Sequence, residues 1–268
     1  MFREFESHRF RQKYKVVMLN TRTKFYFFLI AYLSLFLYAT VIDFTWQWVA
    51  IGIVLARIFS IIGIDLGYHR LWSHKAFKSA KWFEYVMMIC AIVAYNGSSI
   101  MYVGTHRMHH AFSDTDKDPH GTIWWKICLY MYEVKEIPIR VISDVMRNPF
   151  HRWCHKHYFK IHTAILIMCL IDPVFFGHTI GAIVFGGFLF TGAVNVLAHR
   201  KIGYRNFDTD DNSTNIRWLQ IWSLHEGLHN NHHHDASAYD FAMKPGEYDV
   251  AAIVLRALAR VKIVDITR

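Results

Sequence analysis

The stretch FYFFLIAYLSLFLYATVI, residues 25–42, decides the fold class because its 18 consecutive residues carry no charge. An α-helix rises 1.5 Å per residue, so this stretch forms a helix about 27 Å long, close to the hydrocarbon thickness of a bilayer. Seven Lys and Arg residues precede it, and no small-residue cleavage site follows a short apolar region. We therefore interpret it as a membrane anchor and not as a removed signal peptide.

Three further apolar segments predict membrane spans, at residues 46–66, 161–176 and 178–198. The first of them follows the anchor after a short link, and the other two turn at Asp172-Pro173 and at Gly177. The prediction is an all-α integral membrane protein with four transmembrane helices in two hairpins, and with a cytoplasmic helical part. Arg57 lies inside the second span, where it either snorkels, makes an internal polar contact or has a functional role.

Residues 82–104 are also apolar and long enough to compete for a fifth span, although Glu84, Asn96 and the Gly97-Ser98-Ser99 run weaken them. If this segment crossed the membrane, the histidines before it and after it would lie on opposite faces and could not share a site. We therefore predict that residues 82–104 form an amphipathic or half-buried helix in the membrane interface.

The basic residues predict the orientation. All but Arg57 of the 30 Lys and Arg residues lie in residues 1–24, 67–160 and 199–268, outside both hairpin turns. By the positive-inside rule these segments, including both termini, are cytoplasmic. The formal charge of +9 is mostly this signal, and it also favours contact with anionic headgroups of the lipid bilayer. No basic stripe alternates with stacking aromatic residues outside the spans, which excludes a nucleic-acid partner. No repeat or linker divides residues 1–268, so we interpret them as one domain.

The composition demands a chemical explanation for the histidines. Charged residues make up only 19% of the chain, against about 25% in soluble domains, yet 18 residues are histidine. The four cysteines form no CxxC pair, and the chain has no CxxCH or GxGxxG motif. A disulfide framework, a Cys-ligated zinc site, attached haem and a dinucleotide turn are therefore disfavoured. Any redox cofactor must be held by His, Asn or carboxylate side chains.

Three histidine motifs follow the predicted spans on one side: His69 with His74, the HRMHH run with His106, His109 and His110, and the HNNHH run with His229, His232 and His233. Positions i, i+3 and i+4 share a helix face, so the second and third motifs each present three imidazoles in one direction. His69 and His74 are about 140° apart on a straight helix, so they either reach two different metal ions or flank a bend. Asn195 and His199, one turn apart, lie at the end of the last span.

About nine histidines on one side suit two transition-metal ions, because imidazole binds Fe, Zn and Cu well. Two adjacent redox-active ions could reduce dioxygen and remove hydrogen from an unactivated C–H bond, whereas zinc has no redox chemistry. The carboxylate-rich di-iron site of soluble helical bundles needs two ExxH motifs, and only Glu226 with His229 fits one. A metal transporter is disfavoured, because its ligands would follow a path across the bilayer.

At these histidines the sequence resembles the membrane-bound fatty acid desaturases of the Δ9 acyl-chain type, most closely their short cyanobacterial-like acyl-lipid members. The matching segments are GIDLGYHRLWSH (63–74), VGTHRMHHAFSDTDKDPH (103–120), NVLAHRKIGYRNFD (195–208) and STNIRWLQIWSLHEGLHNNHHH (213–234). In order and spacing the resemblance covers essentially all of residues 25–265.

The resemblance implies that two irons are ligated by His69, His74, His106, His109, His110, His199, His229, His232 and His233, with Asn195 reaching one iron through a water. It also implies an O₂-dependent reaction that inserts a cis double bond, usually between carbons 9 and 10, into a saturated acyl chain. Two electrons come from a separate donor such as ferredoxin or cytochrome b5. A lipid-linked acyl chain is the favoured substrate, while acyl-CoA, acyl-ACP and a hydroxylase with the same metal set remain alternatives.

Several residues near the motifs have open roles. Asp65 stands where the family commonly has Thr, and it either accepts a hydrogen bond from an imidazole or faces water at the helix end. His225 and His234 extend the third motif and could be extra ligands. The remaining polar residues are predicted to hydrogen-bond ligand imidazoles or cytoplasmic basic residues, or to be solvated at the surface: Asp114, Asp116, Asp118, His120 and Glu226.

Overall fold

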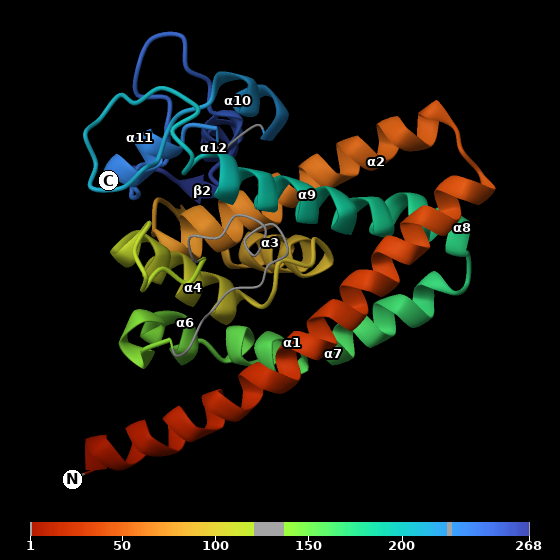
Figure 1. Ribbon diagram of the computed structural model, residues 1–268, viewed down its shortest axis with the longest axis horizontal. Helices are drawn as coiled ribbons and strands as arrows, with labels where there is room; N and C mark the ends of the chain where they lie inside the picture. The colour runs from red at the N-terminus through yellow and green to blue at the C-terminus, as the bar shows by residue number, and fades with distance from the viewer. Residues whose placement is uncertain (1, 121–136, 224–226, 268) are drawn as a thin grey trace.

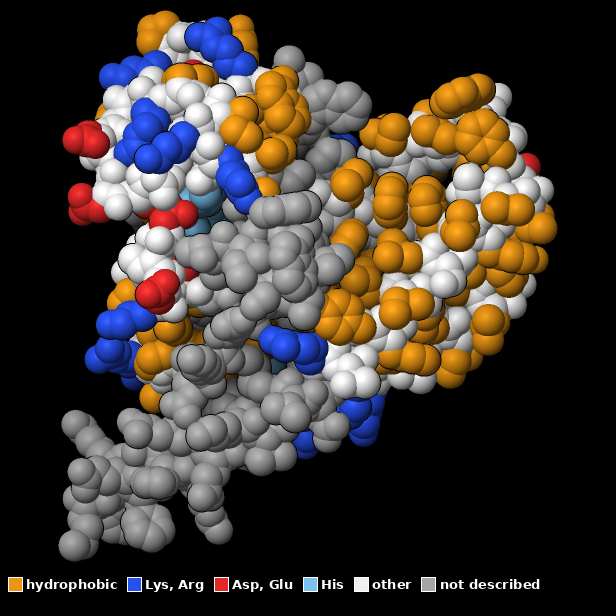
Figure 2. Space-filling model, in the orientation of Figure 1, with side chains coloured by type: hydrophobic (Ala, Val, Ile, Leu, Met, Phe, Trp, Pro, Cys, Tyr) orange, Lys and Arg blue, Asp and Glu red, His pale blue; other side chains and the backbone are white. Residues whose placement is uncertain are grey.

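The computed structural model describes residues 2–120, 137–223 and 227–267, and these residues are mostly helical. In Figure 1 the long apolar helices extend together toward one end of the molecule, and the part of the chain that follows α9 lies at the other. Hydrophobic side chains cover the first end, while most of the visible charged side chains lie toward the second (Figure 2). The fold therefore separates an apolar part from a polar part.

The first helical hairpin is built from residues 2–73. Helix α1 (Phe2–Ile42) is followed by α2 (Trp46–Phe59), which begins where the Thr45 side chain accepts a hydrogen bond from the backbone N–H of Trp48. Helix α2 continues directly into η1 (Ser60–Ser73), a π-helix. Residues 22–42 and 46–73 are both long and apolar enough to cross a membrane, as the first two predicted spans require.

The second hairpin differs from the prediction at its turn. Helix α7 (Pro149–Cys169) is followed by α8 (Pro173–Phe176), η3 (Gly177–Gly181) and α9 (Ala182–Leu197). Asp172 accepts a hydrogen bond from the backbone N–H of Phe175, and Pro173 occupies the first turn, so a new helix begins there. Residues 161–176 are therefore not one helix, and the apolar helix that follows the turn is residues 173–197.

Three helices in the described part of the chain are long and apolar enough to span a bilayer. Helix α7 is not among them, because its first half carries Arg152, Lys156 and Lys160. A crossing by residues 161–176 therefore stays a prediction. Arg57, within the second of the three helices, is buried and makes contacts inside the protein.

The predicted interfacial helix over residues 82–104 is two helices in the structure, α3 (Lys81–Val93) and α4 (Ser99–Phe112). Tyr95 and Gly97 have φ values of 60° and 81°, which end α3, and the Ser98 side chain accepts a hydrogen bond from the backbone N–H of Met101 to begin α4. The change of direction matters for function, because α4 carries the second histidine motif.

The polar part also contains a short sheet, which the all-α prediction did not include. Strand β1 (Lys78–Ser79) pairs antiparallel with β2 (Val264–Asp265), which follows α12 (Val250–Arg260). The short elements η2 (Ile139–Val141), α6 (Ser143–Arg147), α10 (Arg217–Ser223) and α11 (His229–His234) complete the described chain. The largest buried core joins η1, α3, α4 and α12 through residues such as Tyr68, Met87, Val103 and Leu255.

Candidate metal centre

The first histidine motif lies at the end of the π-helix η1. The backbone N–H of His74 donates to the carbonyl of His69 at 3.1 Å, a bond between residues five apart that is typical of a π-helix. This winding brings residues five apart toward the same face, whereas a straight α-helix separates them by about 140°. His69 and His74 therefore lie in one group of candidate ligands, and the expectation that they face two different ions does not match the structure.

Nine histidines form two clusters, in each of which the candidate ligand atoms lie within 4.8 Å of one another. Cluster A contains His69, His74, His106, His110 and His232. Cluster B contains His109, His199, His229 and His233. Each helical motif is thus divided between the clusters. Helix α4 contributes His106 and His110 to cluster A and His109 to cluster B. Helix α11 contributes His232 to cluster A and His229 and His233 to cluster B. The clusters touch where the rings of His110 and His233 stack with centroids 4.4 Å apart.

The Nε2 atoms of cluster A converge at distances that suit a shared ion. The Nε2 atom of His106 lies 2.7 Å from that of His74 and 3.1 Å from that of His110. The Nε2 atom of His232 lies 3.0 Å from that of His69 and 2.8 Å from that of His110. The five candidate ligand atoms are close enough together for one ion to bind between them.

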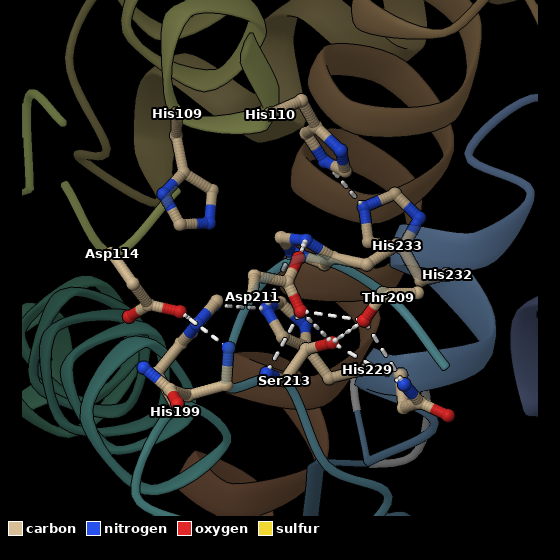
Figure 3. Close-up of polar contacts among 12 residues, drawn as sticks. His109, His110, Asp114, His199, Thr209, Asp211, Ser213, His229, His232 and His233 are labelled. Atoms are coloured by element: carbon tan, nitrogen blue, oxygen red, sulfur yellow. Dashed lines mark hydrogen bonds and ion pairs between the residues drawn. The ribbon is translucent and has the colours of Figure 1, made fainter. Parts of the chain in front are cut away.

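The hydrogen bonds of cluster B show why a cation fits between its nitrogens (Figure 3). The Nδ1 atoms of His199 and His233 lie 3.0 Å and 2.5 Å from the carboxylates of Asp114 and Asp211, so each Nδ1 holds the proton and each Nε2 carries a lone pair. Both Nε2 atoms face the Nε2 atom of His229, at 2.9 Å and 3.1 Å. Because His229 cannot donate one proton to both, a bound cation is the arrangement that satisfies all three nitrogens.

Two further carboxylates hold imidazoles of the clusters. Asp65 is fully buried, and its Oδ1 atom accepts a hydrogen bond from Nδ1 of His69 at 3.2 Å, so it does not face water. Asp118 accepts from Nδ1 of His109 at 2.9 Å and from the backbone N–H of His120 at 2.9 Å. The His120 ring stacks on that of His109 with centroids 4.4 Å apart. These contacts fix the Nδ1–H tautomer and leave Nε2 free to bind a metal.

Burial keeps most of the clustered imidazoles neutral at pH 7. It lowers the pKa well below the ordinary value for His74, His106, His109, His110, His229 and His232. Burial also lowers the pKa of His120, to about 4, and raises the pKa of Asp118. At Asp114 and Asp211 burial acts to raise the pKa, but the hydrogen bond and electrostatic attraction of the histidine partner, together with further hydrogen bonds, hold the pKa below its usual value. Neutral imidazole is the form that binds a metal.

Arg107, between two candidate ligands of α4, fixes this helix against the end of η1. Its guanidinium donates to the backbone carbonyl of Trp72 at 2.6 Å and to that of Ser73 at 2.9 Å, the two residues before His74. It also pairs with both carboxylate oxygens of Asp144 at 2.8 Å. The first and second motifs are therefore held together by a side chain that binds no metal itself.

Asparagine side chains fix α11 in a similar way. The side-chain oxygen of Asn215 accepts hydrogen bonds from the backbone N–H groups of Asn230 and Asn231 at 2.9 Å and 3.2 Å. The Asn231 side chain donates to the backbone carbonyl of Phe241 at 2.8 Å and to Glu247 at 2.7 Å. The two asparagines of the HNNHH run thus face the protein interior, while its histidines face the clusters.

The other predicted site residues lie as follows. Asn195 is half-buried on α9 and makes contacts within the protein, and its bond to an ion through water stays a prediction. The His234 ring stacks on Phe207 with centroids 3.7 Å apart, and neither cluster includes His234. His225 and Glu226 lie outside the described residues.

Two contacts at the site were not foreseen from the sequence. Asp211 lies 22 residues before its partner His233, in a loop whose spacing carries no helical or motif signal. Arg70 is buried and donates to Asp65 at 3.0 Å and to Asp249 at 3.0 Å, with its guanidinium 4.1 Å from the centroid of the Phe241 ring. The only local indication of the Arg70 contacts is that Arg70 directly follows His69 in the sequence.

Comparison with known proteins gives a consistent result. A sequence profile described as fatty acid desaturase matches residues 44–240. The sn-1 stearoyl-lipid 9-desaturase of Anabaena variabilis is 34% identical over 218 residues, which cover 76% of this chain and 76% of that protein. The protein of the same name from Synechocystis sp. is 35% identical over 81% of this chain and 70% of its own length. Delta-9 acyl-lipid desaturase 2 of Arabidopsis thaliana is 30% identical over 80% of this chain and 72% of its own length.

Proposed function

The chain belongs to the fatty acid desaturase family, and on that premise we propose that it is an acyl-lipid Δ9 desaturase with two iron ions, dioxygen as co-substrate and an external electron donor. The observation that carries the proposal is the convergence of nine imidazoles into clusters A and B, which touch at His110 and His233. Two iron ions bound there would supply the redox chemistry that activates dioxygen and removes hydrogen from a C–H bond.

Iron suits the donor set better than zinc does. All nine candidate ligands are imidazoles, which bind iron well, and cluster A offers five of them, one more than a tetrahedral site holds. Zinc in structural sites is almost always tetrahedral and has no redox chemistry. A preparation that contains zinc would therefore be an inactive form.

The residues around the clusters orient the ligands. Asp65, Asp114, Asp118 and Asp211 accept hydrogen bonds from Nδ1–H groups, so the Nε2 lone pairs stay directed into the clusters. Burial of the imidazoles excludes bulk water, and it removes the competition of protons for the Nε2 atoms. Because the ligands come from α4, α11 and the C-terminal ends of η1 and α9, the site forms only when all four segments are packed.

The proposed reaction converts two adjacent CH₂ groups into a cis CH=CH group. It consumes one dioxygen, two electrons and two protons and yields two water molecules in addition to the olefin. The electrons would come from a separate carrier such as ferredoxin or cytochrome b5. The names of the two cyanobacterial relatives support a lipid-linked acyl chain as substrate and carbon 9 as the position of the new bond.

We further propose that the chain crosses the membrane four times, with both termini and the two clusters on the cytoplasmic side. The distribution of Lys and Arg supports this orientation, and the apolar end of α7, residues 161–169, supports the crossing predicted for residues 161–176. A reporter enzyme that is active only in the cytoplasm tests it: a fusion after Arg268 should be active, and an insertion between Asp43 and Phe44 should be inactive. The reverse pattern would contradict the proposed topology.

The function is tested by expressing the full chain in a host that lacks its own desaturase and analysing the fatty acids of each lipid class with double-bond localisation. We expect a new Δ9 monoene that appears first in glycerolipids. His109→Ala and His232→Ala should abolish it, whereas His157→Ala, which changes a histidine beside Trp153 and outside both clusters, should not. A product that appears first in the acyl-CoA or acyl-ACP pool would correct the carrier, and an alcohol product would identify a hydroxylase.

A further inference from the structure

The two clusters differ in the carboxylates that hold their imidazoles. In cluster B, Asp118, Asp114 and Asp211 accept hydrogen bonds from three of the four histidines, at 2.9 Å, 3.0 Å and 2.5 Å. In cluster A, Asp65 holds His69, one of five histidines, at 3.2 Å. Within the described residues, cluster B therefore has three carboxylate partners where cluster A has one.

Cations offset the carboxylate charge at cluster A. Asp65 pairs with the buried Arg70, and Arg107 lies against the carbonyls of the two residues before His74. The ion pairs of Arg70 and Arg107 belong to a set of three carboxylates and three cations. The carboxylates are Asp65, Asp144 and Asp249, and the cations are Lys75, Arg70 and Arg107. The net charge of this set is zero.

The aspartates of cluster B differ in this respect. Within the described residues, the ion pairs of Asp118, Asp114 and Asp211 are those with the histidines of the cluster. Arg205 donates to the backbone carbonyls of Asp211 at 2.7 Å and Ser213 at 3.0 Å and not to their carboxylates.

This difference in nearby carboxylates changes the relative stability of the oxidised and reduced forms of a bound ion. A carboxylate that accepts a hydrogen bond from Nδ1–H makes the imidazole a stronger electron donor through Nε2, and nearby negative charge stabilises the ion of higher charge. Both effects are stronger in a buried site, where water screens the charges less than at the surface. Each of them favours Fe(III) over Fe(II) at cluster B relative to cluster A.

We infer that the two metal positions are redox-inequivalent, and that the ion in cluster B has the lower reduction potential and is oxidised before the ion in cluster A. The inference rests on the proposed function, because it takes the two ions to be iron. The inference assigns a distinct role to each position: the ion in cluster B gives up an electron first, and the ion in cluster A stays Fe(II) longest.

The test is a redox titration of the full chain loaded with ⁵⁷Fe. The protein is reduced with dithionite, freed of excess reductant, and titrated with ferricyanide, each molecule of which takes one electron from one Fe(II) to give ferrocyanide and Fe(III). Mössbauer spectra are recorded at each step. At one ferricyanide per protein we expect one Fe(II) component to be oxidised about three times as much as the other, which for two independent one-electron sites corresponds to a potential difference of 59 mV.

Variants assign the components to the clusters. Asp211→Asn should make the early component harder to oxidise and bring the two steps together, and Asp114→Asn is a second variant with the same expected direction in case the first binds less iron. Asp65→Asn should change only the late component. Asp116→Asn, which alters an exposed aspartate of the same loop, is the matched control and should change neither.

The outcomes separate this inference from the proposed function. Equal oxidation of both components at every step, or an Asp211→Asn change confined to the late component, would overturn the inference while leaving the desaturase function intact. A purified protein that holds two irons but forms no olefin would contradict the function and leave the titration valid. A protein that binds no iron would overturn both.

Discussion

Arg70 and Asp249 are 179 residues apart in the chain, yet their side chains form a buried pair with two contacts, of 2.9 Å and 3.0 Å. Asp249 also begins α12 by accepting a hydrogen bond from the backbone N–H of Ala252 at 3.0 Å. Arg70 in turn donates to Asp65, which holds His69. The C-terminal helix is thus connected to cluster A through three side chains.

Asp249→Asn should destabilise the protein and loosen cluster A together. Removing one partner of a buried ion pair costs about 3–5 kcal/mol, and the substitution leaves Asp65 as the remaining carboxylate partner of Arg70. Thermal unfolding in detergent and the iron content per chain measure the two effects. The matched control is Asp240→Asn, which breaks the partly exposed pair with Arg256 and should cost less than about 1 kcal/mol. Equal losses in the two variants would contradict the coupling of α12 to the site.

Asp118→Asn should weaken iron binding without unfolding the protein. The substitution removes the charged acceptor of the His109 Nδ1–H proton, and loss of such a partner lowers metal affinity by about 10–100-fold. Competition with a chelator of known affinity measures the change. Asp116→Asn, two residues earlier and exposed, should leave the affinity unaltered.

His233→Ala and His234→Ala should behave differently although the residues are adjacent. His233 belongs to cluster B and carries the Asp211 contact, so its loss should lower the iron content. His234 stacks on Phe207 outside both clusters, so its loss should leave the iron content unchanged. Iron measured per purified chain decides whether His234 is an additional ligand, which an equal decrease in both variants would indicate.

Gly63→Ala should destabilise the packing of η1 against α3. A Cβ atom at position 63 would overlap the backbone of Cys90 and Ala91, and backbone cannot move aside as a side chain can. Overpacking of this kind costs about 1–3 kcal/mol or more. Gly67→Ala, where the new Cβ would lie 3.1 Å from the Met87 side chain, should cost less in the same unfolding assay. The reverse order would contradict the close approach of the two helices.

Stability should fall as the pH is lowered from 7 to 5, in part because of His151. Burial lowers the pKa of His151 to about 4, and its Nδ1 atom lies 2.9 Å from the Ser99 hydroxyl. In the unfolded chain the pKa is about 6.5, so the unfolded state binds the proton first. The stabilisation from neutral His151 is complete above pH 6.5 and is lost as the pH falls toward 4, a difference of about 3 kcal/mol.

Unfolding temperatures of the wild type and of His151→Gln at pH 7, 6 and 5 measure this contribution. Glutamine can still bond Ser99 but does not titrate, so the variant should lose less stability between pH 7 and 5 than the wild type does. Parallel curves for the two proteins would show that His151 is not a source of the pH dependence.

The sequence by itself determined the features that are local in the chain. Runs such as residues 25–42 predict membrane helices because hydrophobicity and helix length are properties of one segment. The HRMHH and HNNHH runs predict a metal centre because three imidazoles at i, i+3 and i+4 share a face. The resemblance to the desaturases follows from the same motifs, and the comparisons confirm it.

The tertiary structure decided how the histidines are divided. Spacing alone grouped His106, His109 and His110 as one unit, but the structure gives the first and third to cluster A and the second to cluster B. The π-helical turn that brings His69 and His74 together depends on η1 packing against α3 and α4, and no motif in residues 60–74 predicts this turn.

The charges around the clusters were also decided only by the fold. Asp211 reaches His233 from a loop, and Asp249 reaches Arg70 from the far end of the chain, so neither contact leaves a periodic pattern. A carboxylate 22 or 179 residues away is indistinguishable in the sequence from one in solvent. Local periodicity therefore predicted which residues could bind metal, whereas long-range packing set the electrostatic environment of each cluster, because a side chain's field depends on distance in space and not on separation in sequence.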